Sequence, residues 1–195
     1  MDVEWVRLAL DLNGFDAVRF EPYVRGARRA GIGFTTLAGL GDTPGNRRAL
    51  YELDLACAAD SPERGEFRTF DEYFAWRAVT PAFDPYGVVL ALDGGAWVGM
   101  AMTSVRPGGD AFSEMTGLLA GCRGRGISPA LKLLAVSFAR SRGARRLRAV
   151  HHPANAPAIA VNRRFGFVDE VRGEKADAGR AGGGGDPRRP WTPSD

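Results

Sequence analysis

Cysteine, histidine and lysine are scarce in this chain of 195 residues. Cys57 and Cys122 are the only cysteines, and neither has a second cysteine at the spacing of a metal site or a redox pair. We therefore expect two reduced thiols and no metal. No hydrophobic run reaches the ~18 residues that span a bilayer, and Asp2 and Glu4 stand where a signal peptide carries basic residues. These features predict a cytoplasmic protein that does not associate with membranes.

Basic residues give a net charge of +3 at pH 7, but they do not form a block. Lys132 and Lys175 are the only lysines, and the arginines are spread along the chain. A nucleic-acid interface usually gathers its basic residues on one face or in one run. The composition therefore favours a solvated basic surface, and we expect no nucleic-acid partner.

The length and the hydrophobic content of 45% suit one complete domain with one core. We place that domain at residues 31–172. Two amphipathic stretches precede it, from Val3 to Leu12 and from Phe20 to Ala30, and they predict an N-terminal helical extension over residues 1–30. Residues 173–195 contain four consecutive glycines and three prolines. Such a segment buries too little apolar surface to fold, so we expect a flexible tail.

Within the domain the hydrophobic pattern alternates between the helical and the extended period. Thr69 and Glu72 have the spacing of a capping box at the start of one helix. A longer helix runs through Leu131 and Phe138 and ends at Gly143. Further helices are expected at 47–58 and 155–165, and strands at 34–40, 87–92, 96–104, 111–119, 145–151 and 167–171. The three strands between 87 and 119 predict an antiparallel meander, and the strand and helix alternation after it implies parallel pairing.

The segment between the meander and the long helix is rich in glycine. A helix presents unpaired backbone N–H groups at the positive end of its dipole, which suits a phosphate. Gly124 and Gly126 let the backbone approach an anion, Ser128 offers a capping hydroxyl, and Arg123 and Arg125 add positive charge. An anion site and an ordinary tight turn both remain open on this pattern. The sequence of a P-loop or of a dinucleotide-binding turn is absent.

These residues resemble the signature [QR]-x-x-G-x-[GA] of the GNAT superfamily of acyl-CoA-dependent N-acyltransferases, with Arg123, Gly126 and Ser128 at its three positions. Downstream, the segment from Asn155 to Phe167 is similar to the family's N-x-x-[AM] helix that closes on Gly-Phe. Two motifs at the right separation are far more specific than one. The resemblance covers residues 86–171 and extends more loosely back to Gly31.

The resemblance implies an α/β fold with a mixed, partly antiparallel twisted sheet that is splayed between strands 4 and 5 and flanked by helices. It also implies acyl-CoA, most often acetyl-CoA, as a co-substrate lying in the split, with no metal. Its pantetheine arm would pair with one strand like an extra strand, and its pyrophosphate would lie against the glycine-rich turn. The residues implied to bind it are Leu118, Leu119, Ala120, Arg123, Gly124, Arg125, Gly126, Ile127, Ser128 and Asn155.

The tyrosine that many relatives use to protonate the leaving thiolate is missing, because its position holds Asn162 and no tyrosine follows Tyr86. Asn162 could donate a hydrogen bond or simply pack the helix. Glu114 is a candidate general base on the fourth strand, where alternation places it on the same face as Thr116 and Leu118. An exposed strand glutamate is the alternative.

His151 is a second candidate for proton transfer, since it ends the fifth strand where many relatives carry asparagine. For His151 and for its neighbour His152, a hydrogen bond to backbone is the structural alternative. Cys122 lies beside the glycine-rich turn, where packing is favoured over reactivity.

The function implied is transfer of an acetyl group to a primary amine of a small molecule, by direct attack in a ternary complex. A non-catalytic acyl-CoA-binding regulatory domain and a protein or peptide N-acetyltransferase remain alternatives. Aromatic residues that could line the acceptor side, or equally the core, are Trp76, Phe83, Tyr86 and Trp97. The oligomeric state is left open, a homodimer included.

Overall fold

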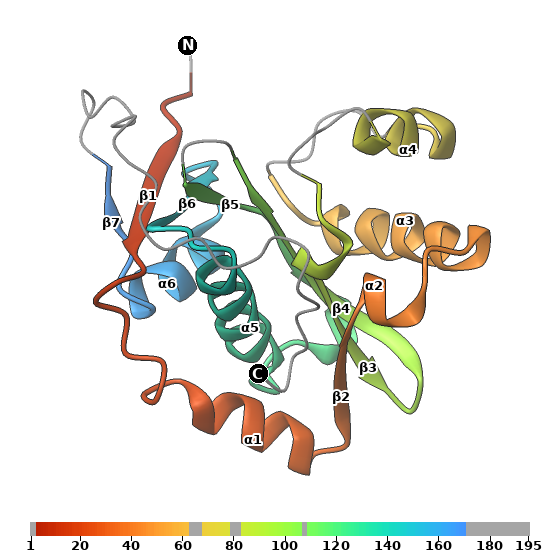
Figure 1. The fold of residues 1–195 in the computed structure, drawn as a ribbon, viewed down its shortest axis with the longest axis horizontal. Helices are drawn as coiled ribbons and strands as arrows, with labels where there is room; N and C mark the ends of the chain where they lie inside the picture. The colour runs from red at the N-terminus through yellow and green to blue at the C-terminus, as the bar shows by residue number, and fades with distance from the viewer. Residues whose placement is uncertain (1–2, 63–67, 79–82, 107–108, 171–195) are drawn as a thin grey trace.

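The computed structural model describes residues 3–62, 68–78, 83–106 and 109–170 (Figure 1). The expected tail at 173–195 lies outside this part. Seven strands form one mixed sheet in the order β2-β3-β4-β5-β6-β1-β7, with helices packed on both faces. Among the described residues, the helices are all too short or too polar to cross a bilayer.

The antiparallel meander is confirmed. It consists of β2 (Ile32–Thr36), β3 (Val88–Asp93), β4 (Ala96–Val105) and β5 (Asp110–Leu118). Gly94 and Gly95 both adopt positive φ in the turn between β3 and β4, as a tight hairpin requires. The expected first strand is shorter than the pattern suggested, because the Thr36 hydroxyl accepts a hydrogen bond from the Gly39 amide and starts the short helix α2 (Leu37–Leu40).

The helix expected from Val3 to Leu12 is wrong. This segment forms β1 (Val6–Asp11), which lies between β6 (Arg146–His151) and β7 (Val168–Asp169) and runs antiparallel to both. Leu8, Leu10 and Leu12 are buried at every second position, which is the period of a strand. Pairing with a strand far along the chain decided between the two periods. The second stretch is helical as expected, in α1 (Glu21–Arg29).

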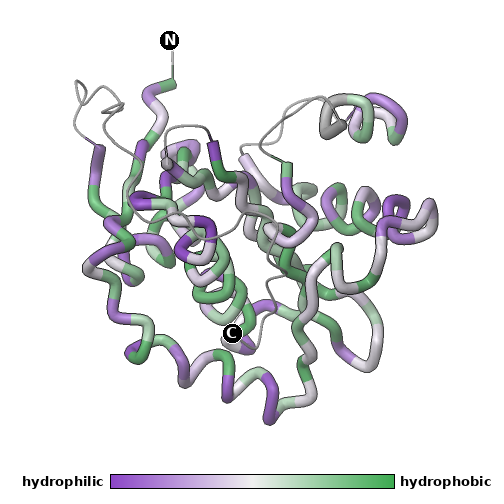
Figure 2. Tube along the Cα trace, viewed as in Figure 1, coloured by the Kyte–Doolittle hydropathy of each residue, from purple (hydrophilic) through white to green (hydrophobic). Residues whose placement is uncertain are grey.

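Two separate cores lie on the two faces of the sheet. On one face, α5 (Ile127–Ser141) packs against α1 and against β3, β4 and β5, and it is apolar along most of its length (Figure 2). On the other face, α3 (Pro44–Ala58) packs against β4, β5 and α4 (Phe70–Ala78). The capping box of α4 is confirmed, because Thr69 and Glu72 exchange backbone and side-chain hydrogen bonds.

Three short elements complete the fold. A 3-10 turn, η1 (Pro85–Gly87), leads into β3, and a second one, η2 (Ala120–Cys122), follows β5. Helix α6 (Ala156–Arg164) connects β6 to β7. Phe165, directly after α6, stacks on Phe20 with ring centroids 4.0 Å apart and so ties this end of the sheet to the start of α1.

Candidate functional site

The sheet opens between β5 and β6. These two strands run parallel, but their pairing ends at Phe112 opposite Arg148, so residues 113–118 of β5 diverge from residues 149–151 of β6. Backbone N–H and C=O groups along a diverging strand have no neighbouring strand to bond. The split therefore offers a row of donors and acceptors to an extended, amide-bearing molecule, and it lies between the strands predicted to separate.

A β-bulge places Glu114 at the head of this split. Met102 pairs with Met115 but Thr103 pairs with Ser113, so Glu114 is the extra residue. The bulge reverses the alternation that follows it. Leu118 joins the core beneath α5, whereas the exposed Glu114 accepts a short hydrogen bond from the Ser104 hydroxyl.

The prediction that Glu114 shares a face with Thr116 and Leu118 is therefore wrong. Strict alternation holds only when a strand keeps its register, and a bulge cannot be read from the sequence of one strand. Ser104 lies two residues from Met102, whose side chain belongs to the core beneath α3. Glu114 thus faces the side of the sheet covered by α3 and α4.

The glycine-rich turn leads directly into α5. Gly124 and Gly126 both adopt left-handed φ, at 77° and 75°, and Gly126 is the N-cap residue of the helix. The sequence predicted that Ser128 caps the helix, and this prediction is wrong, because Ser128 is already the second helical residue. Gly126 has no side chain to accept from the first turn, so the start of α5 has no side-chain cap.

Consecutive backbone amides in this turn remain unbonded. Among the described residues, no acceptor lies within hydrogen-bond geometry of the N–H groups at positions 124–128. Pro129, which has no N–H, follows them directly. A run of amides at the positive end of a helix dipole is the arrangement that binds a phosphate. The described part of the turn therefore has the unbonded donors that an anion site needs, and the binding of an anion there stays a prediction.

The two arginines of the turn are less available to bind a phosphate than the sequence suggested, because each is paired with an aspartate. Arg123 forms an ion pair with Asp60 at 3.2 Å, and Arg125 forms one with Asp93 at 2.7 Å. The hydrogen bond that Arg125 donates to Asp93 raises the pKa of Arg125 above its ordinary value. Both pairs are largely exposed and hence weak. They position the turn between the ends of α3 and β3, while the main chain supplies its unbonded donors.

Asn162 and His151 meet on the other wall of the split. Asn162 is 1% exposed, and its amide nitrogen lies 2.6 Å from His151 Nε2. When the amide donates, His151 Nε2 accepts. The Asn162 amide oxygen is buried without a hydrogen-bond partner in the described structure.

Asn155 and His152 have structural contacts of their own. Asn155 caps α6, since its side-chain oxygen accepts from the Ala158 amide at 3.4 Å. His152 Nδ1 accepts from the Ala154 amide at 3.1 Å, which is the backbone contact considered for a histidine at this position. A contact between Asn155 and a bound molecule stays a prediction.

Lys132 is a residue that the sequence reasoning missed. It is 3% exposed on α5, and its ammonium donates to the Ser113 hydroxyl at 2.9 Å, next to the bulge. Burial lowers its pKa from 10.5 to about 8. A lysine inside the apolar run from Ile127 to Ala139 was the available signal, because a solvated lysine would interrupt the buried face of the helix.

The remaining candidate residues are the two cysteines and the aromatic residues considered for the acceptor side. Cys57 and Cys122 are free thiols, and burial raises the pKa of Cys57 to about 12, so it is inert as a nucleophile. Phe83 and Trp97 pack against the core beneath α3, and Tyr86 packs against the core beneath α5. Trp76 lies in α4. Within the described ranges no three metal-ligating side chains come together.

Comparison with known proteins agrees with this geometry. The family model for the acetyltransferase (GNAT) family matches residues 47–167. Proteins named mycothiol acetyltransferase from Frankia casuarinae and Pseudarthrobacter chlorophenolicus are each 31% identical to this chain, over 136 and 126 residues. These matches cover 64% and 62% of this chain but 39% and 38% of those proteins, so the chain spans about two fifths of the length of these relatives.

Solved structures confirm the fold. A GCN5-related N-acetyltransferase from Sphaerobacter thermophilus matches with a TM-score of 0.59 and 21% identity, covering 85% of this chain and 48% of that one. At this identity the likeness concerns the fold alone. It confirms the expected α/β architecture with an open mixed sheet.

Proposed function

The chain belongs to the acetyltransferase (GNAT) family, and from this premise we propose that it transfers an acetyl group from acetyl-CoA to a primary amine of a small molecule. The observation that carries the proposal is the run of unbonded amides at positions 124–128, placed where β5 leaves the split and α5 begins. These amides fit the pyrophosphate of coenzyme A, and the open edge of β5 fits its amide-bearing arm. The thioester of acetyl-CoA supplies the activated acetyl group.

Residues at the head of the split provide the proton chemistry. Glu114 projects from the bulge toward the α3 side, and its carboxylate accepts the proton that the attacking amine must lose. The Ser104 hydroxyl holds this carboxylate by donating a hydrogen bond to it. Glu114 is thus the general base of the proposed mechanism, acting directly or through one water.

Asn162 and His151 act on the opposite wall. The Asn162 amide nitrogen is bonded to the His151 ring, and its oxygen is buried without a partner among the described residues, so it can accept a hydrogen bond from the bound arm only after the surrounding side chains move. Helix α6 has Asn162 where many relatives carry a tyrosine, so no tyrosine of this helix supplies a proton to the leaving thiolate. A thiolate is a good leaving group, so positioning by the two walls of the split supplies much of the rate, as in well-oriented intramolecular reactions.

The acceptor is proposed to be a small molecule because the curated relatives are named mycothiol acetyltransferases. The proposed general base beside the split supports direct attack of the amine in a ternary complex. Of the two free thiols, Cys57 is buried, and Cys122 accepts a hydrogen bond from Arg125 at 4.0 Å. The proposed reaction uses neither thiol as a nucleophile.

Two measurements on the purified chain test this proposal. Calorimetric titration with coenzyme A should give saturable binding, and incubation with acetyl-CoA should release free thiol only when an amine is present. The amine panel includes the acceptor of the mycothiol acetyltransferases and short peptides with free N-termini. Thiol release with peptides and with no other amine would favour a protein or peptide N-acetyltransferase. If coenzyme A does not bind, the proposed function is wrong.

A substitution of Glu114 tests its proposed role as the general base. Glu114→Gln keeps the size and the hydrogen bond to Ser104 but removes the base, so the turnover rate should fall by about a hundredfold or more, while the affinity for coenzyme A stays unchanged. Glu52→Gln on α3 is the matched control and should leave both unchanged. An unaltered turnover rate in the Glu114 variant contradicts the assignment of the base.

A second candidate function is a regulatory domain that binds acyl-CoA without chemistry. One observation favours it, namely that the tyrosine position holds the buried Asn162, already bonded to His151. Tight binding of coenzyme A together with no thiol release for any amine would support this alternative.

A further inference from the structure

An arginine lies close to Glu114 on the same face of the sheet. Arg106 directly follows β4, and its backbone amide donates to the Asp110 carbonyl at 2.9 Å, which holds it at the start of β5. Its guanidinium lies over the ring of Phe112, with the guanidinium carbon 3.9 Å from the ring centre. Within the described part of the chain, Arg106 forms no ion pair. Stacking on a ring leaves the N–H donors at the edge of the guanidinium available.

Strand pairing makes Arg106 and Glu114 neighbours. Ser104 on β4 is directly opposite Phe112 on β5, and opposite residues of paired strands project from the same face with their Cβ atoms about 5 Å apart. The Ser104 hydroxyl donates the hydrogen bond that holds the Glu114 carboxylate. One carboxylate at Ser104 and one guanidinium over Phe112 are therefore separated by about one interstrand spacing.

The two opposite charges are held apart and are open to solvent. Glu114 and Arg106 are both exposed, and Phe112 is half-buried. They do not pair with each other, because Glu114 is bonded to Ser104 while the guanidinium stacks on the ring. A small molecule can reach both groups without displacing any core side chain. The pair therefore suits a molecule that carries a positive and a negative group of its own.

The neighbouring arginine on this face is neutralised. Arg148 on β6 is opposite Phe112 on its other side, and it forms ion pairs with Asp110 at 3.1 Å and with Glu170 at 3.0 Å. Two carboxylates surround this single positive charge, so the surroundings of Arg106 are slightly negative. Because Glu114 and these carboxylates repel a second negative charge, a carboxylate suits Arg106 better than a phosphate dianion does.

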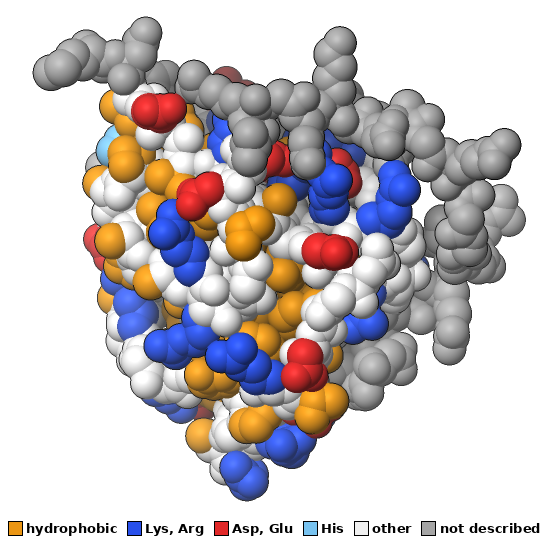
Figure 3. All heavy atoms as spheres, turned by 90° about the vertical axis from the view of Figure 1, so that its left-hand side faces the viewer, with side chains coloured by type: hydrophobic (Ala, Val, Ile, Leu, Met, Phe, Trp, Pro, Cys, Tyr) orange, Lys and Arg blue, Asp and Glu red, His pale blue; other side chains and the backbone are white. Residues whose placement is uncertain are grey.

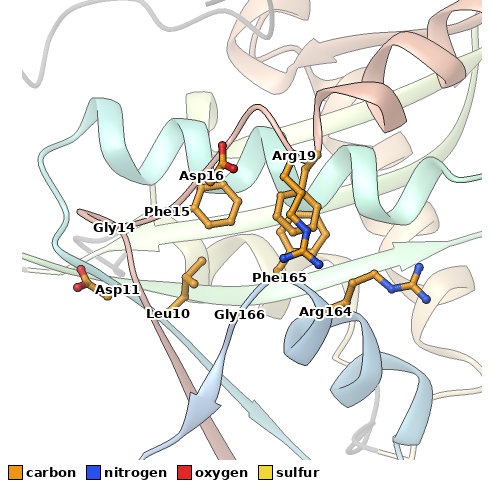
Figure 4. A pocket seen from close by; sticks show the side chains of 10 residues that line it. Leu10, Asp11, Gly14, Phe15, Asp16, Arg19, Arg164, Phe165 and Gly166 are labelled. Carbon is orange, nitrogen blue, oxygen red and sulfur yellow. The ribbon is translucent and has the colours of Figure 1, made fainter.

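A cavity of about 360 Å³ lies elsewhere, between the segment that joins β1 to α1 and the end of α6 (Figure 4). Its phenylalanines, Phe15, Phe20 and Phe165, belong to the core beneath α5, on the opposite face of the sheet from Glu114. The Arg164 side chain points away from them. Figure 3 shows acidic and basic side chains interspersed over the side of the molecule where β1 and β7 lie. This cavity is therefore no part of the acceptor site at Glu114.

We propose that Arg106 binds a carboxylate of the acceptor, so that the small-molecule substrate carries an amine and a carboxylate a few bonds apart. The inference rests on the proposed function, because it takes Glu114 as the group that receives the proton of the amine. The amine lies at Glu114, and the guanidinium donates two parallel hydrogen bonds to the carboxylate. Phe112 is a positioning residue, which holds the guanidinium in place through the stacking contact.

The test measures thiol release from acetyl-CoA with pairs of amines that differ in the carboxylate alone: glycine and glycinamide, β-alanine and β-alaninamide, γ-aminobutyrate and γ-aminobutyramide. For the wild-type chain, kcat/KM should be about tenfold or more higher for the acid of at least one pair, the order of a charge-assisted hydrogen bond. Arg106→Met keeps an apolar stem over Phe112 but removes the donors, and should bring this ratio close to one. Phe112→Leu should raise KM for the acid several-fold with little change in kcat.

Arg145→Met is the matched control, because Arg145 is exposed, lies directly before β6 and donates its backbone amide to the Gly109 carbonyl. It removes the same charge and should keep the preference for the acid. A preference that persists in Arg106→Met places the anion site elsewhere and overturns the inference.

The remaining outcomes separate this inference from the proposed function. Equal kcat/KM within every pair overturns the inference, and thiol release with the amides then leaves the proposed function intact. If no amine gives thiol release, the proposed function itself is wrong, and the inference fails with it. A higher kcat/KM for O-phosphoethanolamine than for every acid would show that Arg106 binds a phosphate, which overturns the assignment of a carboxylate.

Discussion

The helices α3 and α6 begin differently from α5. Thr43 caps α3 by accepting from the Asn46 amide, and Asn155 caps α6 by accepting from the Ala158 amide. Helix α5, which has the same length as α3, follows Gly126 and has no side-chain cap. Lys132 is buried about one and a half turns further along this helix. Helix α1 also lacks a side-chain cap, but its Glu21 and Tyr23 amides bond to the carbonyl oxygens of Ala17 and Phe20. The first amides of α5 have no such partner among the described residues.

This difference agrees with the proposed role of α5 in binding coenzyme A. An uncapped helix end and a buried lysine both lower stability, since unbonded amides and desolvated charge each carry a free-energy cost. Both features lie on the side of α5 that faces the split. A bound diphosphate would satisfy the amides, which agrees with the proposed binding of coenzyme A at this helix end.

The largest effect should come from closing the anion site. Gly126→Asp puts a carboxylate beside the unbonded amides and should weaken binding of coenzyme A about a thousandfold, the order of one close charge repulsion of ~4 kcal/mol. Gly126→Asn has nearly the same size and tolerates left-handed φ, so it is the control. Calorimetry should show a much smaller loss for the asparagine variant. Equal losses in the two variants would indicate steric exclusion and not charge.

The next largest effect concerns the buried lysine. Because burial lowers the pKa of Lys132 to about 8, the folded protein releases this proton at lower pH than the unfolded chain does. Between pH 8 and 10.5 the unfolded chain binds more protons, so this group makes stability rise with pH. Lys132→Met should remove that rise and increase the free energy of unfolding at pH 7 by on the order of 3 kcal/mol.

Urea unfolding at several pH values measures this change. Arg140→Met, an exposed substitution on the same helix, should keep the wild-type dependence on pH. A Lys132→Met protein that still gains stability between pH 8 and 10.5 would show that another group titrates there. The lysine variant also reports on the site, because a role of the ammonium in the split would lower turnover even though stability rises.

A smaller effect is expected at the cap of α6. Asn155→Ala should lower the free energy of unfolding by about 1 kcal/mol through the lost cap. If the Asn155 amide contacts the pantetheine arm, the variant should also bind coenzyme A about tenfold more weakly. Thermal unfolding and calorimetry on the same protein separate the two. Lost stability with unchanged affinity would leave Asn155 as a cap only.

The smallest effect should come from α3, whose cap is remote from the turn. Thr43→Ala should cost about 1 kcal/mol of stability and leave the affinity for coenzyme A unchanged. Measuring both quantities completes the comparison of capped and uncapped helices. Weakened binding here would mean that the two faces of the sheet are coupled more closely than their separate cores suggest.

Much of the fold followed from local patterns. The meander, α5, α6 and the capping box of α4 were all predicted, because each depends on residues close together in the chain. The strand β1 was not predicted, since its segment has both a helical and an alternating reading and only pairing with β6 selects one. The direction of Glu114 was wrong for a similar reason, because a bulge is a property of two paired strands.

The candidate site divides in the same way. The sequence by itself determined the glycine-rich turn, its helix and the absence of the usual tyrosine, because these depend on residue types at fixed spacings. The tertiary structure alone decided that Arg123 and Arg125 are each paired with an aspartate, that Asn162 meets His151, and that Lys132 is buried beside Ser113. These contacts join residues far apart in the chain, and their energies depend on burial and on partners that no local pattern specifies.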